Sequence, residues 1–108
     1  MFSRPSLQQW NLQSLAVVQA LIGAPSPNFR RVTLDHDQGK WIIAFVLEHD
    51  DAADREEIAD FAADWDAQQS GPEPREIQVV IAAGELERPA PRVRILYQRR
   101  ESIGEAAD

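Results

Sequence analysis

The chain has 108 residues, of which 44% are hydrophobic and 27% are charged. These values are ordinary for a globular domain and exclude a disordered chain, and the length predicts one domain with one core. The formal net charge of −7 argues against direct binding of DNA or RNA, because such binding depends on Lys and Arg contacts to phosphates. The absence of cysteine excludes disulfides and thiolate metal sites.

Neither export nor a membrane span is predicted. Residues 1–12 lack the apolar segment of a signal peptide. The longest apolar run, residues 41–47, is far shorter than the roughly 20 residues that a membrane helix needs. We therefore expect a cytoplasmic protein with no membrane partner. A basic protein is the electrostatically complementary partner for such an acidic chain.

The first predicted helix covers residues 6–22. Apolar residues at helical spacing begin after Ser6, a residue type that caps helix amino termini, and a glycine and a proline end the pattern. Its predicted apolar side consists of Leu7, Trp10, Leu15, Val17, Val18, Leu21 and Ile22.

A strand hairpin is predicted next. Residues 29–36 alternate between apolar and polar side chains, residues 37–40 have the composition of a hairpin turn, and residues 41–48 form the return strand. Both faces of the return strand are apolar, which is typical of a strand with neighbours on both sides. We therefore predict that it is central in the sheet.

The second half of the chain repeats this plan. Asp51 is the predicted cap of a second helix, and a segment rich in Gly and Pro at residues 70–74 ends it. Alternation over residues 77–82 and again over residues 92–97 predicts two further strands. The apolar stripe of the second helix consists of Ile58, Phe61, Ala62 and Trp65.

The predicted order is therefore helix, strand, strand, helix, strand, strand. Because the apolar faces of the strands need cover, this order predicts an α+β two-layer sandwich in which two helices cover a mostly antiparallel four-stranded sheet. The sequence leaves the order of the strands open. We expect residues 1–100 to form a single domain, and residues 101–108, which are mostly small and charged, to be a frayed tail.

Two histidines among carboxylates are the best enzymatic candidates, because His, Asp and Glu ligate divalent metals and transfer protons. His36 lies beside the predicted turn, whereas His49 lies at the far end of the return strand, so the two groups are too far apart for one site. Turn formation and helix capping account for the neighbouring carboxylates. The chain also lacks a nucleophile motif and a phosphate-binding loop. We expect no catalytic residue, no metal and no cofactor.

The negative charge is concentrated in one segment. Residues 50–66 hold eight acidic residues and one basic residue, which is the whole net charge of the chain. Asp51 and Asp54 are explained by capping and by the helix dipole. Glu56 with Asp60, and Asp60 with Asp64, are like-charge pairs at a spacing of four that repel by about 0.2 to 0.5 kcal/mol each, without nearby lysines to offset them. We predict that partner binding uses the acidic row, which consists of Glu56, Glu57, Asp60 and Asp64.

Two other interpretations of the acidic row remain open. Such a face can simply keep a small protein in solution, because net charge by itself concerns solubility. Alternatively, arginines on and after the last strand would neutralise the row within the molecule if that strand lay near the second helix. These arginines are Arg92, Arg94, Arg99 and Arg100.

Three short strings resemble small bacterial immunity proteins that neutralise cognate toxins, including those of contact-dependent growth inhibition systems. The strings are Leu21-Ile22-Gly23, Pro27-Asn28-Phe29-Arg30-Arg31-Val32 and Ile58-Ala59-Asp60-Phe61. The resemblance covers about residues 15–65 and transfers no binding residue, because immunity proteins share no functional motif. It implies a non-catalytic protein that blocks a basic carboxy-terminal toxin domain through its acidic surface, with a nuclease as one candidate toxin.

Two alternative functions are kept. An adaptor or accessory subunit of a larger bacterial complex would expose an apolar patch, with Leu12 or Leu96 as candidates. A small metal-dependent or acid–base enzyme would use His36 or His49. Weak salt dependence of binding would favour the adaptor, and unchanged biological activity after replacement of both histidines would remove the enzyme.

Overall fold

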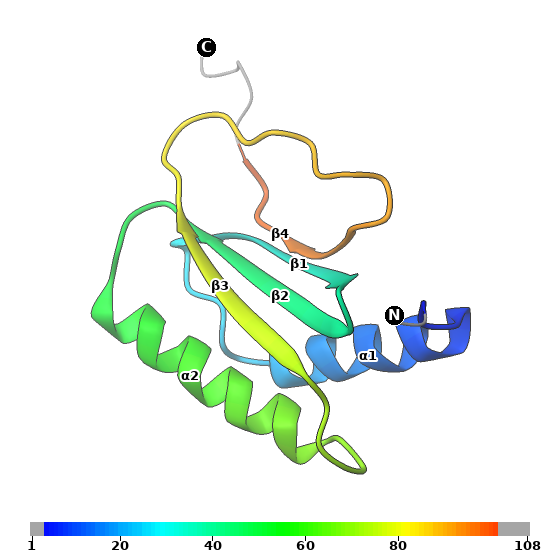
Figure 1. Ribbon diagram of the computed structural model, residues 1–108. Helices are drawn as coiled ribbons and strands as arrows, with labels where there is room; N and C mark the ends of the chain where they lie inside the picture. Colours follow the sequence, from blue (N-terminus) through cyan, green and yellow to red (C-terminus); the bar gives the residue numbers. More distant parts are fainter. Residues whose placement is uncertain (1–3, 102–108) are drawn as a thin grey trace.

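The structure is a computed structural model that describes residues 4–101. It contains two helices and one four-stranded sheet in the predicted order (Figure 1). The elements are α1 (Leu7–Ala20), β1 (Phe29–Asp37), β2 (Lys40–Leu47), α2 (Ala52–Ala67), β3 (Arg75–Ile81) and β4 (Arg94–Gln98). The predicted α+β fold class is confirmed. Residues 102–108, on which most of the predicted frayed tail falls, lie outside the described residues.

The sheet is mixed, with the strand order β3-β2-β1-β4. β1 pairs antiparallel with both β2 and β4, so the prediction of a mostly antiparallel sheet is confirmed. β2 and β3 are parallel because α2 connects them and carries the chain back to its starting end. β2 lies between two strands, as predicted, and the connection from β3 to β4 crosses from one edge of the sheet to the other.

The hairpin between β1 and β2 is tight. Gln38 and Gly39 both have positive φ angles, 52° and 81°, which is the backbone of a two-residue type I′ turn. This turn matches the right-handed twist of the paired strands, and it fixes the register in which Asp37 lies opposite Lys40. Because successive side chains of a strand point to opposite faces, alternate residues of β2 share one side of the sheet, and Trp41, Ile43, Phe45 and Leu47 are buried on it.

Both helices pack on the side of the sheet that carries the buried residues of β2 (Figure 1). The core joins alternate residues of β2 to one side of each helix. Phe45 is completely buried and stacks edge-on against Phe29 of β1 and Phe61 of α2. The apolar stripe predicted for α2 is confirmed, since Ile58, Phe61 and Trp65 are buried and Ala62 packs against them.

The apolar side predicted for α1 is only partly correct. Its capping box is formed, because the Ser6 hydroxyl accepts the Gln9 N–H while the Gln9 side chain accepts the Ser6 N–H. Val17 and Leu21 enter the core. The remaining large aliphatic residues of the predicted side, however, point outward. These exposed residues are Leu7, Leu15, Val18 and Ile22.

Candidate partner-binding surface

Four of the eight acidic residues between residues 50 and 66 have structural roles. The Asp51 side chain caps α2 by accepting the N–H of Asp54 at 3.0 Å, as predicted. At the opposite end of the helix, Arg75 donates two hydrogen bonds to Asp66, and this contact holds the pKa of Asp66 below its ordinary value. Arg55 donates one hydrogen bond to Asp50, which also lowers the pKa of Asp50. These carboxylates are therefore occupied within the molecule.

Asp54 is the fourth of these residues, and its role goes beyond the helix dipole. It is 5% exposed and accepts hydrogen bonds from the Ser26 hydroxyl and the Asn28 amide, both at 2.8 Å. Asn28 also bonds the backbone of His49 through both its amide nitrogen and its amide oxygen. This buried polar cluster joins the start of α2 to the loop before β1 and to the end of β2.

The acidic row behaves differently. All four side chains are exposed on the surface of α2. Within residues 4–101, none of the four takes part in an ion pair or in a side-chain hydrogen bond. Local structure therefore uses the other carboxylates of this segment and leaves these four available. That they bind a partner stays a prediction.

Internal neutralisation by the carboxy-terminal arginines does not occur for the three whose contacts are described. Arg92 pairs with Asp35 of β1, and Arg99 pairs with Glu48 and Glu101. Arg94 donates to side chains of α1 and stands 5.2 Å over the Trp10 ring. The physical reason is topological, because β4 lies at the sheet edge opposite β3, where α2 ends its crossover.

A buried arginine was missed by the sequence reasoning. The side chain of Arg30 is 5% exposed and forms a two-pronged ion pair with Glu101, with distances of 2.9 and 2.7 Å. It also donates to the carbonyl oxygens of Ala82 and Gly84. The hydrogen bond from Arg30 lowers the pKa of Glu101 from 4.5 to about 2. Glu101, the first residue of the predicted tail, is therefore anchored to β1.

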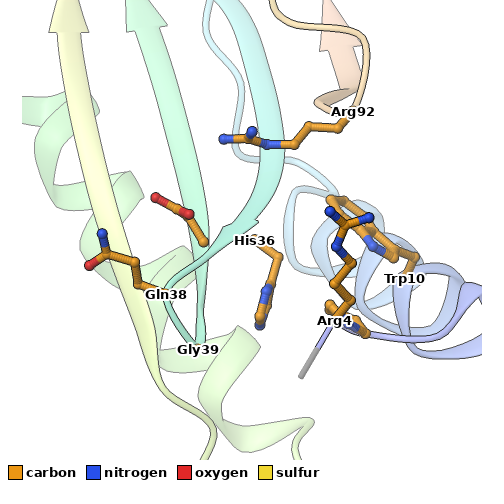
Figure 2. Close-up of a pocket in the computed structure, with 8 residues that line it drawn as sticks. Arg4, Trp10, His36, Gln38, Gly39 and Arg92 are labelled. Carbon is orange, nitrogen blue, oxygen red and sulfur yellow. The ribbon is translucent and has the colours of Figure 1, made fainter. Parts of the chain in front are cut away.

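The histidines do not come together. His36 lines a hollow of about 750 Å³ between α1 and the hairpin, with its ring edge-on to Trp41. Figure 2 shows Arg4 and Trp10 on one side of this hollow and His36 and Gln38 on the other. His49 lies beyond the end of β2, beside the Asp54 cluster. Among residues 4–101, no group of three or more His, Asp or Glu side chains is arranged to hold a metal ion.

The apolar patches predicted for an adaptor differ in exposure. Leu12 of α1 is 58% exposed, whereas Leu96 of β4 is partly buried against the core. In the part of the chain that the structure describes, no helix is long and apolar enough to cross a membrane.

A small α+β domain with an acidic helix face and an exposed apolar helix face has the surface of a protein-binding domain. A family model described as MafI2 immunity protein matches residues 12–101, which is most of the chain. The chain belongs to the MafI2 immunity protein family. This membership extends the resemblance beyond residues 15–65 and indicates a toxin-neutralising, generally non-catalytic role. A search of curated proteins finds no match.

Proposed function

We propose that this protein neutralises a cognate toxin by covering a basic surface of the toxin with the acidic row of α2. The eight carboxylates in residues 50–66 fall into two sets of four, and this difference between them supports the proposal. Half of them cap, pair or are buried, whereas Glu56, Glu57, Asp60 and Asp64 are exposed and make no ion pair within residues 4–101. Membership in an immunity family supplies the class of partner.

The arrangement of the acidic row suits a basic partner. Glu56 with Asp60, and Asp60 with Asp64, are like-charge pairs one helical turn apart, and each repels by about 0.2 to 0.5 kcal/mol in the free protein. A partner that places Lys or Arg between them replaces repulsion with attraction. Complementary charge also raises the rate of encounter, which favours an inhibitor that must reach its toxin quickly.

A nuclease is the toxin class that fits best. Its active cleft is basic because it binds phosphates, so carboxylates spaced along one rigid helix take the place of the nucleic acid backbone. Neutralisation then needs no chemistry by the inhibitor, only occupation of the cleft. Because such a toxin acts on cellular nucleic acid, we expect the two proteins to meet in the cytoplasm.

The genetic setting offers a first test. In a contact-dependent growth inhibition system, we expect the neighbouring upstream gene to encode a large secreted protein with a variable carboxy-terminal domain. That domain, expressed alone, should kill cells that lack this protein and spare cells that produce it. Survival of cells without this protein would remove that domain as the toxin.

Binding kinetics then test the acidic row itself. We compare Glu56→Gln/Glu57→Gln on α2 with Glu85→Gln/Glu87→Gln, two exposed glutamates in the connection between β3 and β4. Both double variants change the net charge equally. At low salt, the α2 variant should lower the association rate constant about 3- to 10-fold and the control by much less. Equal effects of the two variants, or binding that ignores salt, would contradict the proposal.

Charge reversal is the stronger form of the same test. Asp60→Lys/Asp64→Lys should weaken toxin binding more than neutralisation does, because it sets like charges opposite each other across the interface. The variant should stay folded, since both side chains are exposed and make no ion pair or side-chain hydrogen bond within residues 4–101. Unchanged binding by the folded variant would place the toxin on another surface.

A further inference from the structure

The outer side of α1 is a surface that the acidic row does not explain. Residues Leu7–Ala20 include no charged residue, although the chain as a whole has a net charge of −7. The large aliphatic side chains on this side are between 43% and 79% exposed. We call this surface the α1 apolar face, and it consists of Leu7, Leu12, Leu15, Val18 and Ile22.

This face cannot turn inward. The opposite side of α1 is already buried, with Val17 completely covered and Ala16 and Ala20 in the core. The capping box at Ser6 fixes the start of the helix, and side-chain hydrogen bonds between Gln13 and Gln69 tie it to the segment after α2. The α1 apolar face is therefore held toward solvent by the fold itself.

The surroundings of the face are polar but mostly uncharged. A groove of about 420 Å³ runs beside it, lined by Leu12 and Leu15 and by glutamines of α1 and of the segment after α2. The one charged residue among the described groove residues, Glu73, accepts a hydrogen bond from the Trp41 indole. An apolar centre with a neutral polar rim is the composition of a protein interface. Apart from Glu73, the described groove residues offer no charge to a basic toxin.

We propose that a second copy of this chain covers the α1 apolar face, so that the protein is a two-fold symmetric dimer. A copy with the same net charge of −7 is repelled by surfaces rich in carboxylates, such as α2. α1 itself carries no charged residue, so two copies can approach through this helix without bringing like charges of the helix together. The acidic row remains on a different helix, where it is free to bind a toxin.

The exposed apolar area of the α1 apolar face is large enough for a contact between two copies. Its five side chains expose on the order of 500 Å² of apolar surface, which is near the upper limit for the largest patch on a monomer. Two copies would bury about 1,000 Å² in total, the size from which specific interfaces are found. In a two-fold pair Leu15, midway between Leu7 and Ile22, lies near the axis and contacts Leu15 of the other copy.

Mass measurement with a matched pair of variants tests the dimer. Val18 on α1 and Val80 on β3 are 43% and 44% exposed, so Val18→Glu and Val80→Glu make the same chemical change at equal exposure. By sedimentation equilibrium at about 100 μM chain, the unmodified protein and Val80→Glu should have twice the mass of one chain. Val18→Glu should have the mass of one chain.

Two results would overturn the proposal. The first is a single-chain mass for the unmodified protein; if Val18→Glu then also loses toxin binding, the face belongs to the toxin. The second is loss of the dimer in Val80→Glu but not in Val18→Glu, which would place the contact at the β3 edge. Far-ultraviolet circular dichroism establishes that each variant is folded.

Cysteine cross-linking provides a test that adds no charge to the helix. Because the chain has no cysteine, Leu15→Cys creates a single thiol. Mild oxidation should join two Leu15→Cys chains by a disulfide, since the bond requires Cα atoms within about 7 Å. Val80→Cys should remain a single chain. Equal cross-linking of the two variants would show random collision and contradict the two-fold contact at Leu15.

Discussion

Replacing Glu101 with glutamine removes the charge that balances a buried guanidinium. Arg30 has only one carboxylate partner among residues 4–101, and its other contacts are the carbonyl oxygens of Ala82 and Gly84. The pKa of Glu101 falls from 4.5 to about 2 in the folded protein, and each pKa unit corresponds to about 1.4 kcal/mol. The upper limit for the ion pair is therefore about 3 kcal/mol.

The expected loss is smaller than this limit. The Glu101 side chain is 26% exposed, so solvent screens part of the attraction, and glutamine keeps an oxygen that can accept one hydrogen bond. Against this, Arg30 stays buried and loses a charged acceptor, which by itself costs about 1.5 to 3 kcal/mol. We expect Glu101→Gln to lower the free energy of unfolding at pH 7 by about 2 kcal/mol.

The sign of the pH dependence follows from the lowered pKa of Glu101. A carboxyl group with a lowered pKa in the folded state stabilises the protein above its unfolded pKa, here about 4.5, and loses that contribution as pH falls toward 2. The difference between the original protein and Glu101→Gln should therefore be full at pH 7 and fall to about half near pH 3.

Urea unfolding at pH 7, 5 and 3, followed by tryptophan fluorescence, measures this difference. Glu85→Gln is the control, because Glu85 is exposed and makes no ion pair within the described residues; it should change the stability by less than about 0.5 kcal/mol. Equal stability of Glu101→Gln and the original protein at pH 7 would refute the assignment. A difference that stays constant down to pH 3 would refute its electrostatic origin.

Three further changes test other parts of the structure by the same urea unfolding. Asp54→Ala should destabilise the protein by about 2 to 3 kcal/mol, because it leaves the Asn28 amide without its buried acceptor; a loss below 1 kcal/mol would contradict this. Phe61→Ala should cost about 3 to 5 kcal/mol, since it opens a cavity against Phe45, and a native-like midpoint would argue against that packing. Gln38→Asn should raise stability by a few tenths of a kcal/mol, because asparagine tolerates positive φ better than glutamine; a loss would contradict the type I′ turn.

Contacts between distant parts of the chain determine which carboxylates are available. Sequence alone could separate the Asp51 cap from later residues, because capping depends on neighbours three residues away. It could not show that Arg75, beyond the end of α2, returns to pair with Asp66, nor that Asp54 is buried against the loop before β1. Both contacts depend on where the chain goes after the helix ends.

The exposure of the α1 apolar face also depends on how distant parts of the chain pack together. Local periodicity makes residues 7–20 a helix, but the helix is apolar on more than one side, and spacing alone does not select the side that meets the sheet. Packing against α2 and β4 buries Val17 and leaves Leu15 and Val18 outside. The apolar side expected from the sequence was therefore divided between the core and the surface.

Local patterns are sufficient to predict the six elements, their order and the concentration of charge on α2, because helix and strand periods, caps and turns depend on residues close together in the chain. The long-range fold sets the strand order, the parallel pairing of β2 with β3, and the anchoring of Glu101 by Arg30. These features join residues far apart in the chain, and long-range pairing is set by how the whole apolar core is covered rather than by any local pattern.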